Sequence, residues 1–156
     1  MKNEYINQDA AEMHSILRSA SCIKRYDSIS HQLLSELLVA IATGGEVVGG
    51  NNRGSDVLSP EYGKIEVKSR ILGTDGPFPR VSLKSHNIEK ADWFVGIRWN
   101  RDFQFHEAWM LPKSAASELH AARKQGSGLA HISWESWKAG QGAVDLSSKI
   151  RAALIR

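Results

Sequence analysis

The chain has 156 residues, of which 42% are hydrophobic and 24% are charged. This composition excludes a largely disordered chain and fits one folded domain, which we expect to span residues 1–156. The formal net charge of +3 is compatible with a polyanionic partner, although many proteins without such a partner have a similar balance.

The cysteine count and the distribution of apolar residues indicate the cellular compartment that we expect for this protein. Cys22 is the one cysteine, so neither an internal disulfide nor a cysteine-rich zinc site can form. No stretch approaches the roughly 20 apolar residues of a membrane span, and the polar N-terminus lacks the apolar segment of a signal peptide. We therefore expect a soluble, cytoplasmic protein with no membrane partner.

The first half of the chain predicts two helices and then a β-hairpin. Residues Asp9 to Arg25 have apolar positions at helical spacing, with Asp9 as a candidate cap. A second helix is expected over His31 to Thr43, because Gly44-Gly45 ends the pattern. Strands are expected over 46–50, 55–58 and 64–70, the last two joined by a Pro- and Gly-containing turn.

The second half predicts the centre of the sheet and more helices. After a loop over 73–79 and an ambiguous stretch over 80–91, the dense apolar run Trp93 to Trp99 indicates a buried central strand. Phe103 to Leu111 is its expected antiparallel partner, with Phe103, Phe105, Trp109 and Leu111 on one face. Helices follow over 112–125 and 145–155. This order predicts an α/β (α+β) fold with a mixed, mainly antiparallel sheet flanked by helices.

The hairpin holds the residues that point to chemistry. Successive strand side chains alternate between faces, so Ile65 and Val67 face a core while Glu66 and Lys68 face the other way, roughly 6–7 Å apart. If Asp56 lies on the neighbouring strand, its carboxylate can meet that of Glu66. Together with the Val67 carbonyl, they would form an all-oxygen site suited to Mg²⁺, for which Mn²⁺ can substitute.

Phosphodiester hydrolysis needs such a set of groups. A bound metal polarises the phosphoryl oxygen and lowers the pKa of a bound water. A charged Lys68 beside that water would orient it and offset the charge of the transition state. Other polar residues near the hairpin are candidate phosphate contacts: Asn52, Arg53, Arg70, Arg80 and Lys84.

The positions of Asp56, Glu66, Val67 and Lys68 resemble the signature of the PD-(D/E)XK, or restriction-endonuclease-like, nuclease superfamily. Ser55 stands where the signature has its proline. The resemblance covers roughly residues 33–111 and includes a preceding helix with an acid. Glu36 is the candidate for that acid, and Glu46 is the alternative.

This resemblance implies a restriction-endonuclease-like αβββαβ core and a metal-dependent endonuclease. Its catalytic residues would be Asp56, Glu66, Lys68 and Glu36, and its metal ligands Asp56, Glu66 and Val67. The implied cofactor is Mg²⁺ and the implied partner DNA, with RNA left open. Cutting both strands of a duplex usually needs two active sites, so the resemblance is also compatible with a homodimer.

Other interpretations stay open at this point. Residues Lys64, Glu66, Lys68 and Arg70 could form the solvated face of an ordinary amphipathic strand. The same fold could serve as a catalytically inactive nucleic-acid-binding or protein-assembly module. A protein-interaction domain without any role in nucleic-acid binding is a third alternative.

Overall fold

The computed structural model of the chain describes residues 2–21, 30–48, 55–72, 80–100 and 103–155, and divides it into two compact units, Met1–Ser30 and His31–Arg156. The first unit holds the short 3₁₀ helix η1 (Lys2–Tyr5) and α1 (Ile6–Ser19), of which no residue is buried. The helix predicted over Asp9 to Arg25 is present, but it begins at Ile6 and ends at Ser19, so Asp9 lies in its first turn and does not cap it. Tyr5 occupies the cap position without a side-chain bond.

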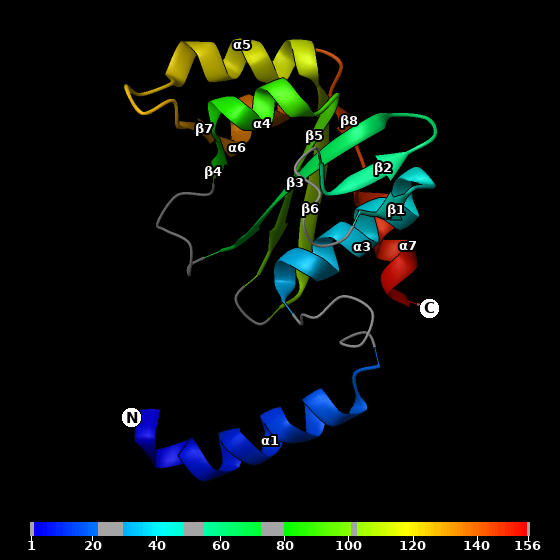
Figure 1. Cartoon of the computed structure of the whole chain (residues 1–156), viewed down its shortest axis with the longest axis vertical. Coiled ribbons are helices and arrows are strands. Elements are labelled where there is room, and N and C mark those ends of the chain that lie inside the picture. The colour runs from blue at the N-terminus through cyan, green and yellow to red at the C-terminus, as the bar shows by residue number, and fades with distance from the viewer. Residues whose placement is uncertain (1, 22–29, 49–54, 73–79, 101–102, 156) are drawn as a thin grey trace. The chain divides into compact units, whose positions relative to one another are not determined.

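The second unit is built on a six-stranded sheet (Figure 1). Its strand order is β1-β2-β3-β5-β6-β8. Only the β3–β5 pair among these strands is parallel, so the predicted mixed, mainly antiparallel sheet is confirmed. The bounds are β1 (Glu46–Val47), β2 (Val57–Ser59), β3 (Gly63–Ile71), β5 (Trp93–Trp99), β6 (Phe105–Pro112) and β8 (Val144–Asp145).

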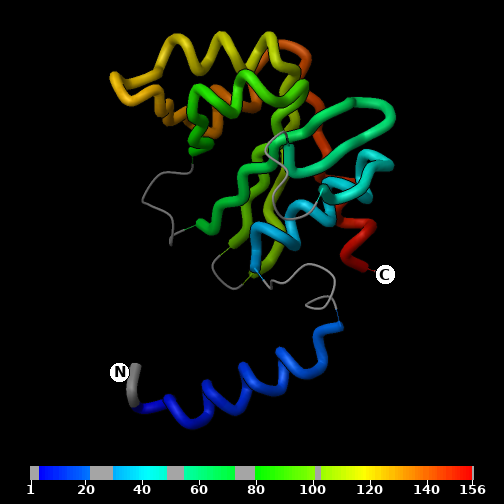
Figure 2. Tube along the Cα trace, in the orientation of Figure 1, coloured from blue at the N-terminus to red at the C-terminus, as the bar shows by residue number. Residues whose placement is uncertain are grey.

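Helices cover both faces of this sheet, as Figure 2 also shows. On one face, α3 (His31–Thr43) and α7 (Ser147–Ile155) pack over a core that includes Val39, Ile65 and Ile97. The other face is covered by a two-stranded ribbon and by helices, around a core that includes Phe94 and Trp137. These elements are β4 (Arg80–Leu83), β7 (Ala130–Ser133), α4 (Ser85–Lys90), α5 (Lys113–Arg123) and α6 (Trp134–Lys138).

Gly96 lets the ribbon approach the sheet closely. A Cβ at this central position of β5 would lie 2.8 Å from the side chain of Val81 on β4 and 3.0 Å from that of Trp134 on α6. Real Cβ atoms do not come so close to other atoms, so the absence of a side chain sets the distance between the two layers.

Several predicted elements are confirmed within a few residues, including α3, the hairpin and the central strand β5. The ambiguous stretch over 80–91 divides into β4 and α4. The predicted common face of the β6 aromatics is wrong, because a bulge shifts the register so that Trp99 pairs with Phe105. Phe105 therefore packs on the α3 side of the sheet, while Trp109 and Leu111 pack on the other side.

In the described part of the chain, every helix is too short or too polar to cross a membrane.

Candidate functional site

The hairpin places Asp56 beside the open edge of β3. Val57 pairs with Ile65, and the Asp56 backbone N–H donates to the Ile65 carbonyl at 3.0 Å. Strand β2 pairs with β3 no further along than this, so the next backbone groups of β3 need other partners. The carboxylate oxygen Oδ2 of Asp56 accepts a hydrogen bond from the Val67 N–H at 2.8 Å. The side chain of Asp56 thus replaces a missing strand at this edge.

Helix α3 contributes a second acid to the same edge. The side-chain Nε2 of Gln32 donates to Glu36 Oε1 at 3.1 Å and to the Val67 carbonyl at 2.9 Å. Gln32 therefore holds Glu36 against β3 while also using one lone pair of the carbonyl. The sequence interpretation missed Gln32, although its spacing of four residues from Glu36 places both on one helix face.

Glu66 and Lys68 complete the group from β3. Lys68 Nζ lies 3.3 Å from Glu66 Oε1, and Asn87 Nδ2 of α4 donates to the same oxygen at 3.3 Å. Only 16% of the Glu66 side chain and 27% of the Lys68 side chain are exposed. Neither residue thus belongs to a freely solvated strand face. Asn87, on a helix that the sequence left ambiguous, was not predicted.

Burial raises the pKa of each carboxyl group in this cluster. Burial raises the pKa of Glu36 to about 7. The hydrogen bond from Gln32 acts to lower this pKa, while the neighbouring Asp56 and Glu66 raise it further. Burial also raises the pKa of Asp56, although the Val67 N–H and Lys68 oppose it. Burial, followed by the charge of Asp56, raises the pKa of Glu66, and Lys68 acts to lower it. One lysine does not balance three acids.

A second polar cluster on the sheet, around Glu107, has enough positive charge to compensate its acid. Burial acts to raise the pKa of Glu107, but hydrogen bonds from Trp134 Nε1 and Lys138, with Arg98 nearby, outweigh it and lower the pKa. Here one acid has two cations and an indole donor. The contrast identifies the cluster of Glu36, Asp56 and Glu66 as the uncompensated one.

The chemistry of this donor set fits a divalent cation. Within the described ranges, no three His, Cys, Asp or Glu side chains are grouped so that they could hold a metal ion. Asp56 and Glu66 nevertheless offer carboxylate oxygens, and the Val67 carbonyl keeps a second lone pair. Excess negative charge among half-buried oxygen ligands is what Mg²⁺ and Mn²⁺ neutralise, in place of a proton.

A basic pocket of about 310 Å³ adjoins Lys68. It brings together three predicted phosphate contacts, Arg70, Arg80 and Lys84. Ser82 and His131 also line it and were not predicted; they lie on the paired strands β4 and β7, with His131 Nδ1 at 2.8 Å from Ser82 Oγ. The remaining predicted contacts, Asn52 and Arg53, lie outside the described residues. The complete lining is Lys68, Arg70, Arg80, Ser82, Lys84, Leu129 and His131.

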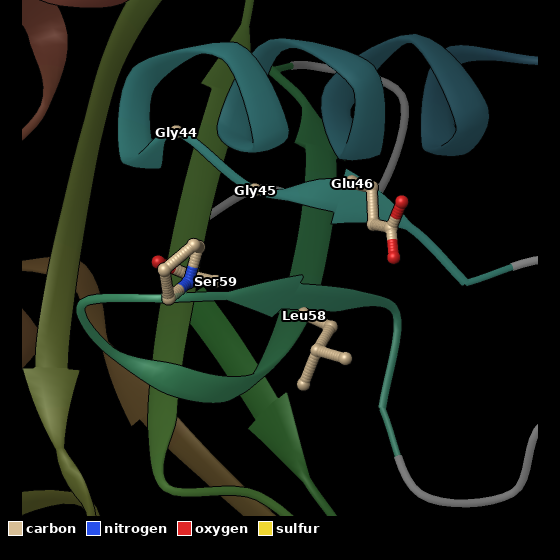
Figure 3. Close-up of a pocket in the computed structure, with 6 residues that line it drawn as sticks. Gly44, Gly45, Glu46, Leu58 and Ser59 are labelled. Atoms are coloured by element: carbon tan, nitrogen blue, oxygen red, sulfur yellow. The ribbon is translucent and has the colours of Figure 1, made fainter.

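The alternative helix acid, Glu46, lies in a different place. It is exposed on β1 and lines a pocket of about 330 Å³ with Gly44, Gly45 and Leu58 (Figure 3). None of the clustered acids lines that pocket. Glu36 is therefore the candidate that lies at the β3 edge, where Gln32 holds it.

No known protein-family model matches the chain, and no curated protein is significantly similar to it in sequence. A functional assignment therefore depends on the acids at the β3 edge and on the basic pocket beside them.

Proposed function

We propose that this protein is a divalent-metal-dependent nuclease that hydrolyses phosphodiester bonds in DNA, in the manner of the PD-(D/E)XK nucleases that its hairpin resembles. One observation carries the proposal. Asp56 accepts the Val67 N–H at the open edge of β3, Gln32 ties Glu36 to the same edge, and Lys68 pairs with Glu66 where the basic pocket begins.

The residues take distinct roles in this proposal. Asp56 and Glu66, with the Val67 carbonyl, would hold Mg²⁺ or Mn²⁺. The metal, when bound, supplies a Lewis acid for the phosphoryl oxygen and lowers the pKa of a bound water. Lys68 orients the attacking water and offsets charge on the phosphoryl group. Glu36, whose pKa is about 7, accepts or releases a proton at its carboxylate near neutral pH.

The expected polymer follows from the charge around the site. Arg70, Arg80 and Lys84 surround the pocket next to Lys68, which suits a backbone with one negative charge per nucleotide. RNA and DNA share that backbone charge, so both polymers belong in the test. Cleavage of both strands of a duplex would require two chains acting together as a homodimer.

The test is cleavage of supercoiled plasmid, linear duplex, single-stranded DNA and RNA in Mg²⁺, with a chelator as the blank. Asp56→Asn and Lys68→Gln should each slow cleavage by about 10²-fold or more. Lys64→Gln is the matched control, because it removes an exposed lysine from the same strand, and its rate should stay within about twofold of wild type. Undiminished cleavage by both Asp56→Asn and Lys68→Gln would rule out this mechanism.

A second candidate is a nucleic-acid-binding module that has lost catalysis. The ion pair that holds Lys68 on Glu66 favours it. This candidate predicts salt-dependent DNA binding without Mn²⁺ binding or cleavage. Stoichiometric Mn²⁺ binding lost in Asp56→Asn would exclude it.

A further inference from the structure

The basic pocket gathers positive charge. Among the described residues that line it, none is an aspartate or a glutamate. Among the described residues, Arg70, Arg80 and Lys84 take part in no ion pair, whereas the pocket's fourth cation, Lys68, pairs with Glu66. Cations gathered in a concave site repel one another unless an anion joins them.

Two separate sheets build this pocket, which makes it more than a run of basic residues on one strand. Lys68 and Arg70 come from β3 of the main sheet, while Arg80 and His131 come from the β4–β7 ribbon that packs above it. Alternation along β4 buries Val81 and Leu83 and leaves the intervening polar residues for the pocket.

His131 and Ser82 add neutral hydrogen-bonding groups to these cations. His131 Nδ1 lies 2.8 Å from Ser82 Oγ, which leaves Nε2 as the second polar atom of the ring. Burial, followed by the nearby Arg80 and Arg70, lowers the pKa of His131. The pKa of the His131 ring thus depends on the positive charge of the pocket, and an anion that neutralises this charge should raise it.

We propose that the basic pocket binds a terminal phosphate monoester of the nucleic-acid substrate, beside the phosphodiester that reacts at the acid cluster. This inference rests on the proposed function, because it takes the substrate to be a nucleic acid. A monoester carries about −1.5 to −2 charges near pH 7, whereas each internal phosphodiester carries one. The excess of cations in the pocket favours the more highly charged group.

The spacing of the two sites supports a shared substrate. Glu66, Lys68 and Arg70 follow one another on one face of β3, so the strand covers about 13 Å from the acid to the arginine. Lys68 belongs to both sites, since it contacts Glu66 and lines the pocket. A strand end held in the pocket would therefore present one of its first linkages to the acids.

The test measures binding without metal, so that it does not depend on cleavage. Single-stranded DNA of one sequence is prepared with a 5′-phosphate, a 3′-phosphate or no terminal phosphate, and its affinity is measured in chelator. We expect one phosphorylated end to bind about tenfold more tightly than the unphosphorylated strand, since hydrogen bonds to charged groups contribute about that factor. Equal affinities for all three strands would overturn the proposal.

Matched variants assign the effect to the pocket. Lys84→Gln and Arg80→Gln should reduce the preference for the phosphorylated end to about twofold or less. Lys124→Gln removes an exposed lysine beyond the end of α5 and should leave the preference intact. Equal preferences in Lys84→Gln and Lys124→Gln would place the phosphate elsewhere and overturn the proposal.

Inorganic phosphate provides a probe independent of nucleic acid. Side-chain NMR signals of His131, assigned by their loss in His131→Gln, should shift as phosphate is added but not as chloride is added at equal ionic strength. Signals that do not respond to phosphate would contradict the pocket. Phosphate binding in a protein that cuts no nucleic acid would instead overturn the proposed function alone.

Discussion

At the scale of single residues, the site differs from the rest of the molecule in its charge balance. Glu107 has two cations and an indole N–H around it, and its pKa falls. Asp56 and Glu66 share Lys68, Glu36 has only a hydrogen bond from Gln32 to oppose its rise, and the pKa values of all three acids rise. The carboxyl groups thus lower the stability of the fold at neutral pH, which is typical of a functional site.

The variant Glu36→Gln should show how much the charged carboxyl group lowers the free energy of unfolding. Because the folded state raises the pKa of Glu36 from 4.5 to about 7, the folded protein binds the extra proton and loses stability as the pH rises through that window. The full shift corresponds to about 3 kcal/mol, which partial exposure reduces to about 1 kcal/mol. Urea unfolding should therefore show the variant gaining about 1 kcal/mol over wild type between pH 4 and pH 8.

Glu46→Gln is the control for this comparison, since it removes an exposed acid from β1. Its free energy of unfolding should follow that of wild type at both pH values. A constant difference between Glu36→Gln and wild type across the pH range would mean that Glu36 is not held among like charges.

At the scale of elements, the site lies where side chains replace the missing hydrogen-bond partners of a sheet edge. Strand β2 is too short to satisfy β3 beyond Ile65, and side chains take over: Asp56 accepts the Val67 N–H and Gln32 donates to the Val67 carbonyl. The same interruption that exposes backbone groups also brings the acids of a helix and a hairpin together.

Local patterns account for the part of the site that the sequence predicted. Asp56, Glu66 and Lys68 lie within one hairpin, whose alternation and turn are encoded over a few neighbouring residues. Ser82 and His131 meet only because β4 and β7 pair across about fifty residues of chain. Each of these strands has four residues, too few for periodicity to reveal, so half of the basic pocket depends on tertiary packing.

Gly96→Ala should test the packing of that ribbon on the sheet. The new Cβ would meet Val81 and Trp134 at 3.0 Å or less, so we expect a loss of about 1–3 kcal/mol in the free energy of unfolding. Gly126→Ala is the matched control, because its Cβ would have no atom within 4 Å. Equal urea midpoints for the two variants would show that the layers do not touch at Gly96.

At the scale of the whole chain, the two hydrophobic clusters found among the described residues belong to the second unit. Their members all lie at or beyond Leu34, and α1 buries no residue. A chain of residues 31–156 should therefore fold alone and keep the urea midpoint of the full chain, because unfolding exposes the same apolar surface. A midpoint lowered by more than about 0.5 M would show that the first unit helps to stabilise the second.

The central claim is that the acids at the β3 edge hold a divalent cation, and calorimetric titration with Mn²⁺ tests it most directly. We predict one Mn²⁺ bound per wild-type chain near pH 7.5, and weaker binding as the pH falls and protons compete for the carboxylates. Binding should disappear in Asp56→Asn and persist in Glu46→Gln. A wild-type chain that binds no Mn²⁺, or an Asp56→Asn chain that binds it unchanged, would contradict the account.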